Sequence, residues 1–181
     1  GLNNKYDKDM VDWAYSGPEE TVNIFKKYAK NKDIKILDAG CGTGLVGIEL
    51  KKNGYLSIDG ADLSKKLLEL VPPNYYETLI QIDLNKSINI KDNTYDAIMC
   101  VGTFTYGHVK PNALDEFIRI CKNKSLICFT INEGIYEEYG FDKKIEKLKN
   151  NNSWKMKEFF KSNYIASKEV SAWLGIAEVI K

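Results

Sequence analysis

The sequence predicts an α/β fold, a three-layer sandwich in which helices cover both faces of a mostly parallel seven-stranded sheet with a C-terminal antiparallel β-hairpin. Short β-type runs alternate with helix-type patterns along most of the chain, which is typical of a parallel sheet covered by helices. Near the end, the strand-like runs 154–165 and 172–180 are joined by a short polar stretch. So short a connection can join only antiparallel strands.

The individual elements follow from the apolar pattern and from residues that begin or end helices. Helices are expected over 18–30, from Leu45 to near Gly54, from Ser64 to the Pro72-Pro73 pair, and from Pro111 to Cys121. Five strands are expected before the hairpin, over residues 33–38, 55–61, 77–82, 95–101 and 125–130.

Composition limits the classes of protein. A chain of 181 residues fits one domain, with no room for a second substrate-binding domain. The net charge of +1 does not indicate a protein built to neutralise a phosphate backbone.

The cysteine pattern and hydropathy bear on localisation. The four cysteines show no paired spacing, no secretory signal pattern opens the chain, and no apolar run approaches the roughly 20 residues that span a bilayer. We therefore expect a reduced, cytoplasmic protein without a membrane partner.

A glycine-rich loop follows the first strand. Asp38 ends that strand, and Gly40, Gly42 and Gly44 follow at alternate positions. Glycine allows positive φ and close approach of the backbone to a ligand, so this loop can wrap the methionine part of a nucleoside cofactor. Asp38 could accept hydrogen bonds from the cofactor's amino group, directly or through water, because ligands of open α/β sheets bind at the carboxyl edge.

A nicotinamide cofactor is the alternative for this loop. Residues 42–47 form a GxGxxG string, and Asp62 lies twenty residues beyond its first glycine. The string begins four residues past the apolar strand rather than directly after it, and a second domain to hold a hydride donor or acceptor is not expected. Both features disfavour the alternative.

Acidic residues also end the second and third strands. Asp62 is placed to accept both ribose hydroxyl protons, whereas Asp59, within the strand, is expected to be solvated. Asp83 is placed to accept from the adenine amino group, with Ile82 in apolar contact with the ring; the alternative is a turn aspartate that caps the loop before Asn85. Together the three strand-end acids would form an acidic rim for a cationic sulfonium cofactor.

These segments resemble a known family. Residues 36–44 and 61–64 resemble motifs I and II of the Rossmann-like class I S-adenosylmethionine-dependent methyltransferases. Residues 17–18, 42–46, 95–98 and 101–102 most resemble the methyltransferase-like group of the Williams-Beuren region. The resemblance implies methyltransferase activity, S-adenosyl-L-methionine as cofactor and S-adenosyl-L-homocysteine as product.

The resemblance also implies roles for single residues. Residues 1–31 would form an amino-terminal lid and first helix, in which Tyr15 closes over the cofactor, and residues 32–181 the cofactor-binding core. The loop would border the methionine moiety, strand two would bind the ribose, strand three the adenine, and strand four would lie beside the methyl group. The residues so assigned are Asp38, Ala39, Gly40, Cys41, Gly42 and Gly44; Asp62 and Leu63; Ile82 and Asp83; and Val101, Gly102 and Thr103.

Methyl transfer is an in-line displacement on a carbon that the sulfonium already activates, so positioning can supply most of the catalysis and a general base is optional. His108, the only histidine, is the candidate base, with a solvated loop histidine as the alternative. Phe104 and Tyr106 would either line the acceptor pocket or pack beneath the following helix.

The predicted acceptor is a small molecule. Residues 101–104 lack the Asn/Asp-Pro-Pro-aromatic tetrapeptide that is typical of enzymes that methylate exocyclic or amide nitrogens. The lysine-rich stretch 143–149 is interrupted by Glu146, which favours a solvated helix face over contact with nucleic acid. A protein or RNA methyltransferase, a cofactor-binding partner subunit without catalysis, and another nucleoside enzyme on the same fold stay open, as does the oligomeric state.

Overall fold

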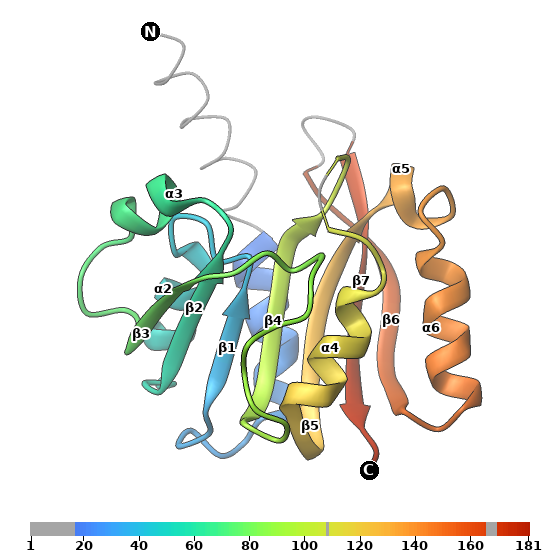
Figure 1. Ribbon diagram of the computed structural model, residues 1–181, viewed down its shortest axis with the longest axis horizontal. Helices are drawn as coiled ribbons and strands as arrows, with labels where there is room; N and C mark the ends of the chain where they lie inside the picture. The colour runs from blue at the N-terminus through green and yellow to red at the C-terminus, as the bar shows by residue number, and fades with distance from the viewer. Residues whose placement is uncertain (1–16, 108, 166–169) are drawn as a thin grey trace, which may run out of the picture.

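A computed structural model describes residues 17–107, 109–165 and 170–181 of the chain. Its centre is a seven-stranded sheet of order β3-β2-β1-β4-β5-β7-β6 (Figure 1). β1 to β5 are parallel, and β7 lies antiparallel between β5 and β6. The predicted α/β fold, with its C-terminal antiparallel hairpin, is confirmed.

The strands lie close to their predicted positions. Their bounds are β1 Ile36–Ala39, β2 Ile58–Asp62, β3 Thr78–Gln81, β4 Tyr95–Phe104, β5 Cys121–Asn132, β6 Trp154–Ile165 and β7 Val170–Val179. β5 begins earlier than the predicted 125–130. Its first residues were not predicted as strand because residues 122–124 are exposed and polar, with Lys124 at a φ of 68°. This polar entry hides the strand from an apolar pattern, although Cys121 already pairs with Tyr95.

Six helices appear in the described part of the chain. They are residues 17–28, α2 Leu45–Lys52, α3 Lys65–Leu70, α4 Ala113–Ile120, α5 Glu133–Tyr136 and α6 Phe141–Asn150. The sequence pattern did not predict α5. A helix of four residues shows no periodicity, and it begins where the Asn132 side chain accepts a hydrogen bond from the Gly134 amide at 2.8 Å.

Helices cover both faces of the sheet (Figure 1). The helix of residues 17–28 and α2 pack on one face, in an apolar cluster with Ile36 and Ile58; α4, α5 and α6 pack on the other, in a cluster with Leu37 and Ala39. Successive β1 side chains therefore enter opposite clusters, as alternation along a strand requires. Both faces of the central strands β1 and β2 are buried, whereas the edge strand β3 is mostly exposed.

Within the described residues, no helix is long and apolar enough to cross a membrane. All four cysteines are buried and unpaired. Burial raises the pKa of each thiol, to about 12 for Cys121, so the thiols stay protonated near neutral pH and pack as small apolar groups.

Candidate functional site

The loop of residues 40–44 turns the chain from β1 into α2 at the carboxyl edge of the sheet. Gly40, Gly42 and Gly44 have φ values of 76°, 54° and 95°. The amides of Gly40 and Cys41 donate to the Ala61 carbonyl oxygen at 2.7 and 2.9 Å, so the loop is fixed to the end of β2. A Cβ atom at Gly42 would meet no atom within 4 Å, which leaves the backbone open to a ligand there.

Asp38 lies at this loop with its carboxylate almost fully buried, at 1% exposure. Its Oδ2 accepts a hydrogen bond from the Tyr76 hydroxyl at 2.6 Å, while its Oδ1 has no partner among the described residues. Burial raises the pKa of Asp38 to about 7; the Tyr76 hydroxyl acts in the opposite direction, and the negative charge of Asp62 adds to the increase. A buried acceptor without a partner, beside an open glycine loop, fits a ligand that carries an ammonium group.

Asp62 connects the loop to the start of α3. Its Oδ2 accepts from the Gly42 amide and its Oδ1 from the Ser64 amide, both at 2.9 Å. Each carboxylate oxygen can accept a further hydrogen bond, so the half-buried group can still bind a ribose diol. Leu63, the next residue, is 61% exposed.

The expectation that Asp59 is solvated is wrong. Asp59 is 6% exposed, accepts from the Tyr95 hydroxyl at 2.9 Å and lies 3.9 Å from the Lys35 Nζ atom. The reason is the parallel sheet, whose two faces are both covered, so alternation along β2 does not lead to solvent.

The end of β4 meets the same loop. A Cβ atom at Gly40 would lie 2.0 Å from the Thr103 Oγ1 atom, so only glycine allows this contact. Gly102, at a φ of 73°, donates its amide to the Thr130 Oγ1 atom at 2.9 Å, where the pairing of β4 and β5 shifts register. Val101, Gly102 and Thr103 are each partly exposed. The structure therefore brings the predicted methyl-facing segment against the predicted methionine loop.

The end of β3 adjoins Asp62, because the Ile82 amide donates to the Asp62 carbonyl oxygen at 3.0 Å. Asp83 forms the turn that the sequence offered as the alternative: its Oδ1 accepts from the Asn85 amide at 2.9 Å, and its Oδ2 lies 3.9 Å from the Lys86 Nζ atom. Free capacity on both oxygens keeps an adenine contact possible.

Four further residues were predicted to belong to the site, and two of them are among the residues that the structure describes. Phe104 is fully buried against α4 and α6, with its ring centroid 6.3 Å from that of Phe117 and 4.7 Å from that of Phe141, which favours the packing alternative over the pocket. Tyr106 is 57% exposed and lies edge-on to Tyr139. Tyr15 and His108 lie outside the described residues.

Sequence reasoning missed Tyr76, which precedes β3 and contacts Asp38. Two glycines gave a signal for it: Gly47 lies inside α2 and Gly60 inside β2, positions where glycine is unfavourable unless another group approaches closely. A Cβ atom at either would come within 3.0 Å of the Tyr76 ring.

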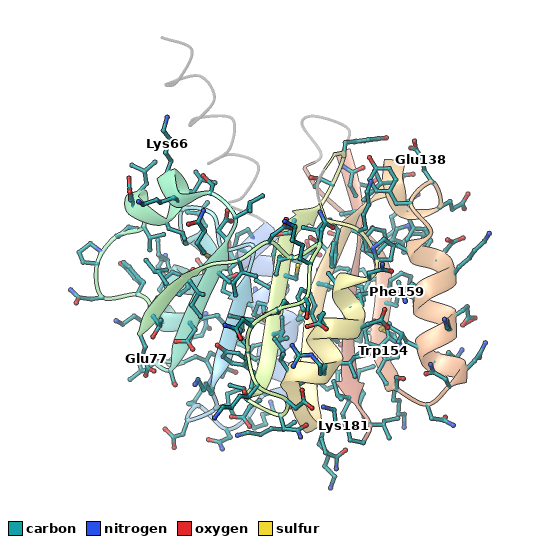
Figure 2. The ribbon with its side chains drawn as sticks, in the orientation of Figure 1. Lys66, Glu77, Glu138, Trp154, Phe159 and Lys181 are labelled. Carbon is teal, nitrogen blue, oxygen red and sulfur yellow. The ribbon has the colours of Figure 1, made fainter. Side chains whose placement is uncertain are left out.

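A groove of about 930 Å³ lies away from this edge, between α6 and β6. Phe159, labelled in Figure 2, lines it together with Tyr136 and Ile145. None of the predicted site residues borders it, and we place the chemistry at the glycine loop because the buried carboxylate and the exposed backbone meet there.

A seven-stranded sheet with a glycine loop after β1 and an acid at the end of β2 defines a Rossmann-like domain of the methyltransferase type. Residues 36–124 match the family model described as a methyltransferase domain. This match and the fold support the predicted class I methyltransferase domain and its dependence on S-adenosylmethionine.

Two curated proteins are similar in sequence to parts of this chain. It is 33% identical over 129 residues to human Methyltransferase-like protein 27, an overlap of 69% of this chain and 52% of the human protein. It is 36% identical over 88 residues to the Malonyl-[acyl-carrier protein] O-methyltransferase of Halalkalibacterium halodurans, 45% of this chain and 32% of that protein. The chain thus spans about half the length of the human relative and about a third of the length of the bacterial one.

The fold has close counterparts among solved structures. A SAM-dependent methyltransferase from Methanosarcina mazei superposes with a TM-score of 0.66 at 16% identity, covering 87% of this chain and 97% of that one. At this identity the likeness shows the fold.

Proposed function

We propose that this chain transfers the methyl group of S-adenosyl-L-methionine to a small-molecule acceptor, with residues 32–181 as the cofactor-binding core. One observation carries the proposal: the Asp38 Oδ1 atom is buried, with no partner among the residues that the structure describes, beside a loop of positive-φ glycines that Asp62 fixes to β2. A cationic amino acid moiety attached to a ribose matches these two carboxylates and the open backbone between them.

Each segment of the edge has a part in holding the cofactor. Asp38 and the loop 40–44 would hold the methionine moiety, Asp62 the ribose, and Ile82 and Asp83 the adenine. Val101, Gly102 and Thr103 would border the reacting methyl group, because Thr103 packs on Gly40. The bound cofactor supplies a methyl carbon activated by its sulfonium.

The chain's own contribution is positioning. The carboxylates orient the cofactor, and the end of β4 limits where an acceptor atom can approach it. A base is needed only when the acceptor must lose a proton, and the candidate for that step is His108.

Two observations support a small acceptor. The relative from Halalkalibacterium halodurans is named for methylating malonyl-[acyl-carrier protein], in which the acyl group is small although its carrier is a protein. Only α5 and α6, within residues 133–153, lie between β5 and β6, and both pack on a face of the sheet, so this connection offers little chain to enclose a large acceptor. The unpaired, buried thiols favour a reducing compartment such as the cytoplasm, and the balanced charge disfavours nucleic acid.

The test is an acceptor screen. The protein is incubated with S-adenosyl-L-methionine and pools of small metabolites, proteins or RNA, and S-adenosyl-L-homocysteine formation is measured against the Asp62→Ala variant. Product formed with a metabolite pool by the wild-type protein alone supports the proposal. Product formed only with protein or RNA contradicts the acceptor class, and cofactor binding without product in any pool favours a partner subunit.

A further inference from the structure

We propose that Tyr76 is a positioning residue of the cofactor site, which holds one Asp38 oxygen so that the other faces the ammonium group of the bound nucleoside. This role rests on the proposed function. It concerns a residue that belongs to neither of the resembled motifs and that precedes β3 in the chain.

A slot formed by three glycines fixes the Tyr76 ring. A Cβ atom would lie 2.4 Å from the ring Cζ atom at Gly47, 3.0 Å from the Cδ1 atom at Gly60 and 3.1 Å from the Cε2 atom at Gly44. These residues belong to α2, to β2 and to the loop itself. The ring therefore joins the helix, the strand and the loop that shape the cofactor edge, and larger residues at these positions would displace it.

The hydroxyl of Tyr76 both donates and accepts a hydrogen bond. It donates to the Asp38 Oδ2 atom at 2.6 Å and accepts from the Gly47 amide at 3.2 Å. Burial raises the pKa of Tyr76, so the hydroxyl stays protonated and keeps donating. With Oδ2 occupied, Oδ1 is the carboxylate oxygen left without a partner among the described residues.

The other titratable groups facing Asp38 do not favour its charge. Asp62, from β2, adds negative charge. Cys41, from the loop, and Cys100, from β4, have raised pKa values because they are buried, so both thiols are neutral. The Tyr76 hydroxyl is thus the side-chain donor that stabilises the ionised Asp38 carboxylate, the form that attracts an ammonium group, and the Gly47 backbone amide acts in the same direction.

The test is the pH dependence of S-adenosyl-L-homocysteine binding, measured by calorimetry from pH 5.5 to 8.5 for wild type, Tyr76→Phe and Tyr75→Phe. Tyr75 is the matched control, a neighbouring tyrosine whose ring faces Lys51 rather than Asp38. Wild-type affinity should rise as the pH passes through about 7, where Asp38 is half ionised, and level off roughly one pH unit higher.

Loss of the hydroxyl raises the pKa of Asp38, so Tyr76→Phe should bind at least about tenfold more weakly at pH 6.5 but less than about threefold more weakly at pH 8.5. Tyr75→Phe should follow wild type. Gly47→Ala, which pushes the ring out of its slot without changing Tyr76 or Asp38, should reproduce the Tyr76→Phe profile, with thermal unfolding of each variant confirming that it is folded.

An equal loss of affinity for Tyr76→Phe at every pH would show a packing role only and overturn the proposal, as would a profile identical to wild type. These outcomes require wild-type binding, which tests the proposed function separately. Wild type that fails to bind at any pH overturns the proposed function and this role with it.

Discussion

Four aspartates at or near strand ends differ in what surrounds their carboxylates. Asp59 is satisfied by Tyr95, Asp83 by its own turn and Asp62 by two amides, whereas Asp38 keeps one oxygen without a partner in the described structure. Only the last combines burial with unused hydrogen-bonding capacity, and such groups mark functional sites more often than stable packing.

The buried Asp38 carboxylate should make stability depend on pH. Its folded-state pKa of about 7 lies above the ordinary value of 3.8, so its stabilising contribution is complete below about pH 4 and is lost as pH rises to 7. Asp38→Asn keeps an acceptor for Tyr76 and removes the charge. Urea unfolding should show Asp38→Asn more stable than wild type by on the order of a few kcal/mol at pH 8, since each pKa unit is about 1.4 kcal/mol.

The matching measurement at pH 5 supplies the control, because Asp38 is then largely protonated in the folded wild type and the gain should shrink. A gain of the same size at both pH values would contradict the assignment. Ligand binding by Asp38→Asn should be weaker in either case, which would make stability and function oppose each other at this residue.

Asp62→Ala should weaken S-adenosyl-L-homocysteine binding by about 30-fold or more, because two hydrogen bonds to a diol are lost, each contributing on the order of 1 kcal/mol or more. The change also leaves the Gly42 and Ser64 amides without their acceptor. Calorimetry provides the measurement, and Asp62→Asn, which keeps one carbonyl oxygen, should retain part of the affinity. Unchanged affinity for Asp62→Ala would remove Asp62 from the site.

The sequence predicted the glycines, Asp38 and Asp62 at one edge because motif spacing and strand ends are local features. Tyr76 was not predictable in that way, since its contact with Asp38 spans 38 positions and follows from how α2 and β2 pack. The burial of Asp59 likewise depends on a neighbour from β4, Tyr95, that no local pattern pairs with it.

Among the elements, α3 differs from the other helices because it buries no residue. It is a short helix whose N-cap, Ser64, accepts from the Leu67 amide at 3.2 Å, and whose Leu70 is 66% exposed. Figure 2 shows Lys66 pointing away from the sheet. The Ser64 cap therefore contributes more to the position of this helix than buried side chains do. Its capping residue and the proline pair after it are local signals, which is why the sequence predicted the helix.

Arg119 of α4 holds the segment between β3 and β4 in place. Its guanidinium donates to the carbonyl oxygens of Ile88 and Ile90 at 2.7 and 2.8 Å, and it pairs with Glu116 and Asp92 at 2.7 Å. Arg119→Ala should lower the free energy of unfolding by roughly 1–3 kcal/mol in urea, because charge-assisted hydrogen bonds to fixed carbonyls are lost.

Lys122→Ala is the control for this prediction, because Lys122 forms a half-exposed ion pair with Asp96 at 3.3 Å. Its loss should change the free energy of unfolding by less than about 0.5 kcal/mol. Equal effects of the two substitutions would show that α4 does not depend on Arg119.

At the scale of the whole molecule, strand order creates the site. β2 and β4 flank β1, so the chain leaves β1 at the point where the order of strands reverses, and ligands of such sheets bind at that crevice. Pattern alone predicted alternating strands and helices and a final hairpin. The order of the strands in the sheet was implied only by the family resemblance, because it depends on long-range pairing that no local pattern records.

The most direct test of the central claim is a calorimetric titration of the purified protein with S-adenosyl-L-methionine, S-adenosyl-L-homocysteine and NAD in parallel. NAD is the comparison because residues 42–47 also match the GxGxxG string. We predict saturable binding of both sulfur nucleosides and none of NAD. Binding of NAD alone, or of none of the three, would contradict the assignment of this edge to S-adenosylmethionine.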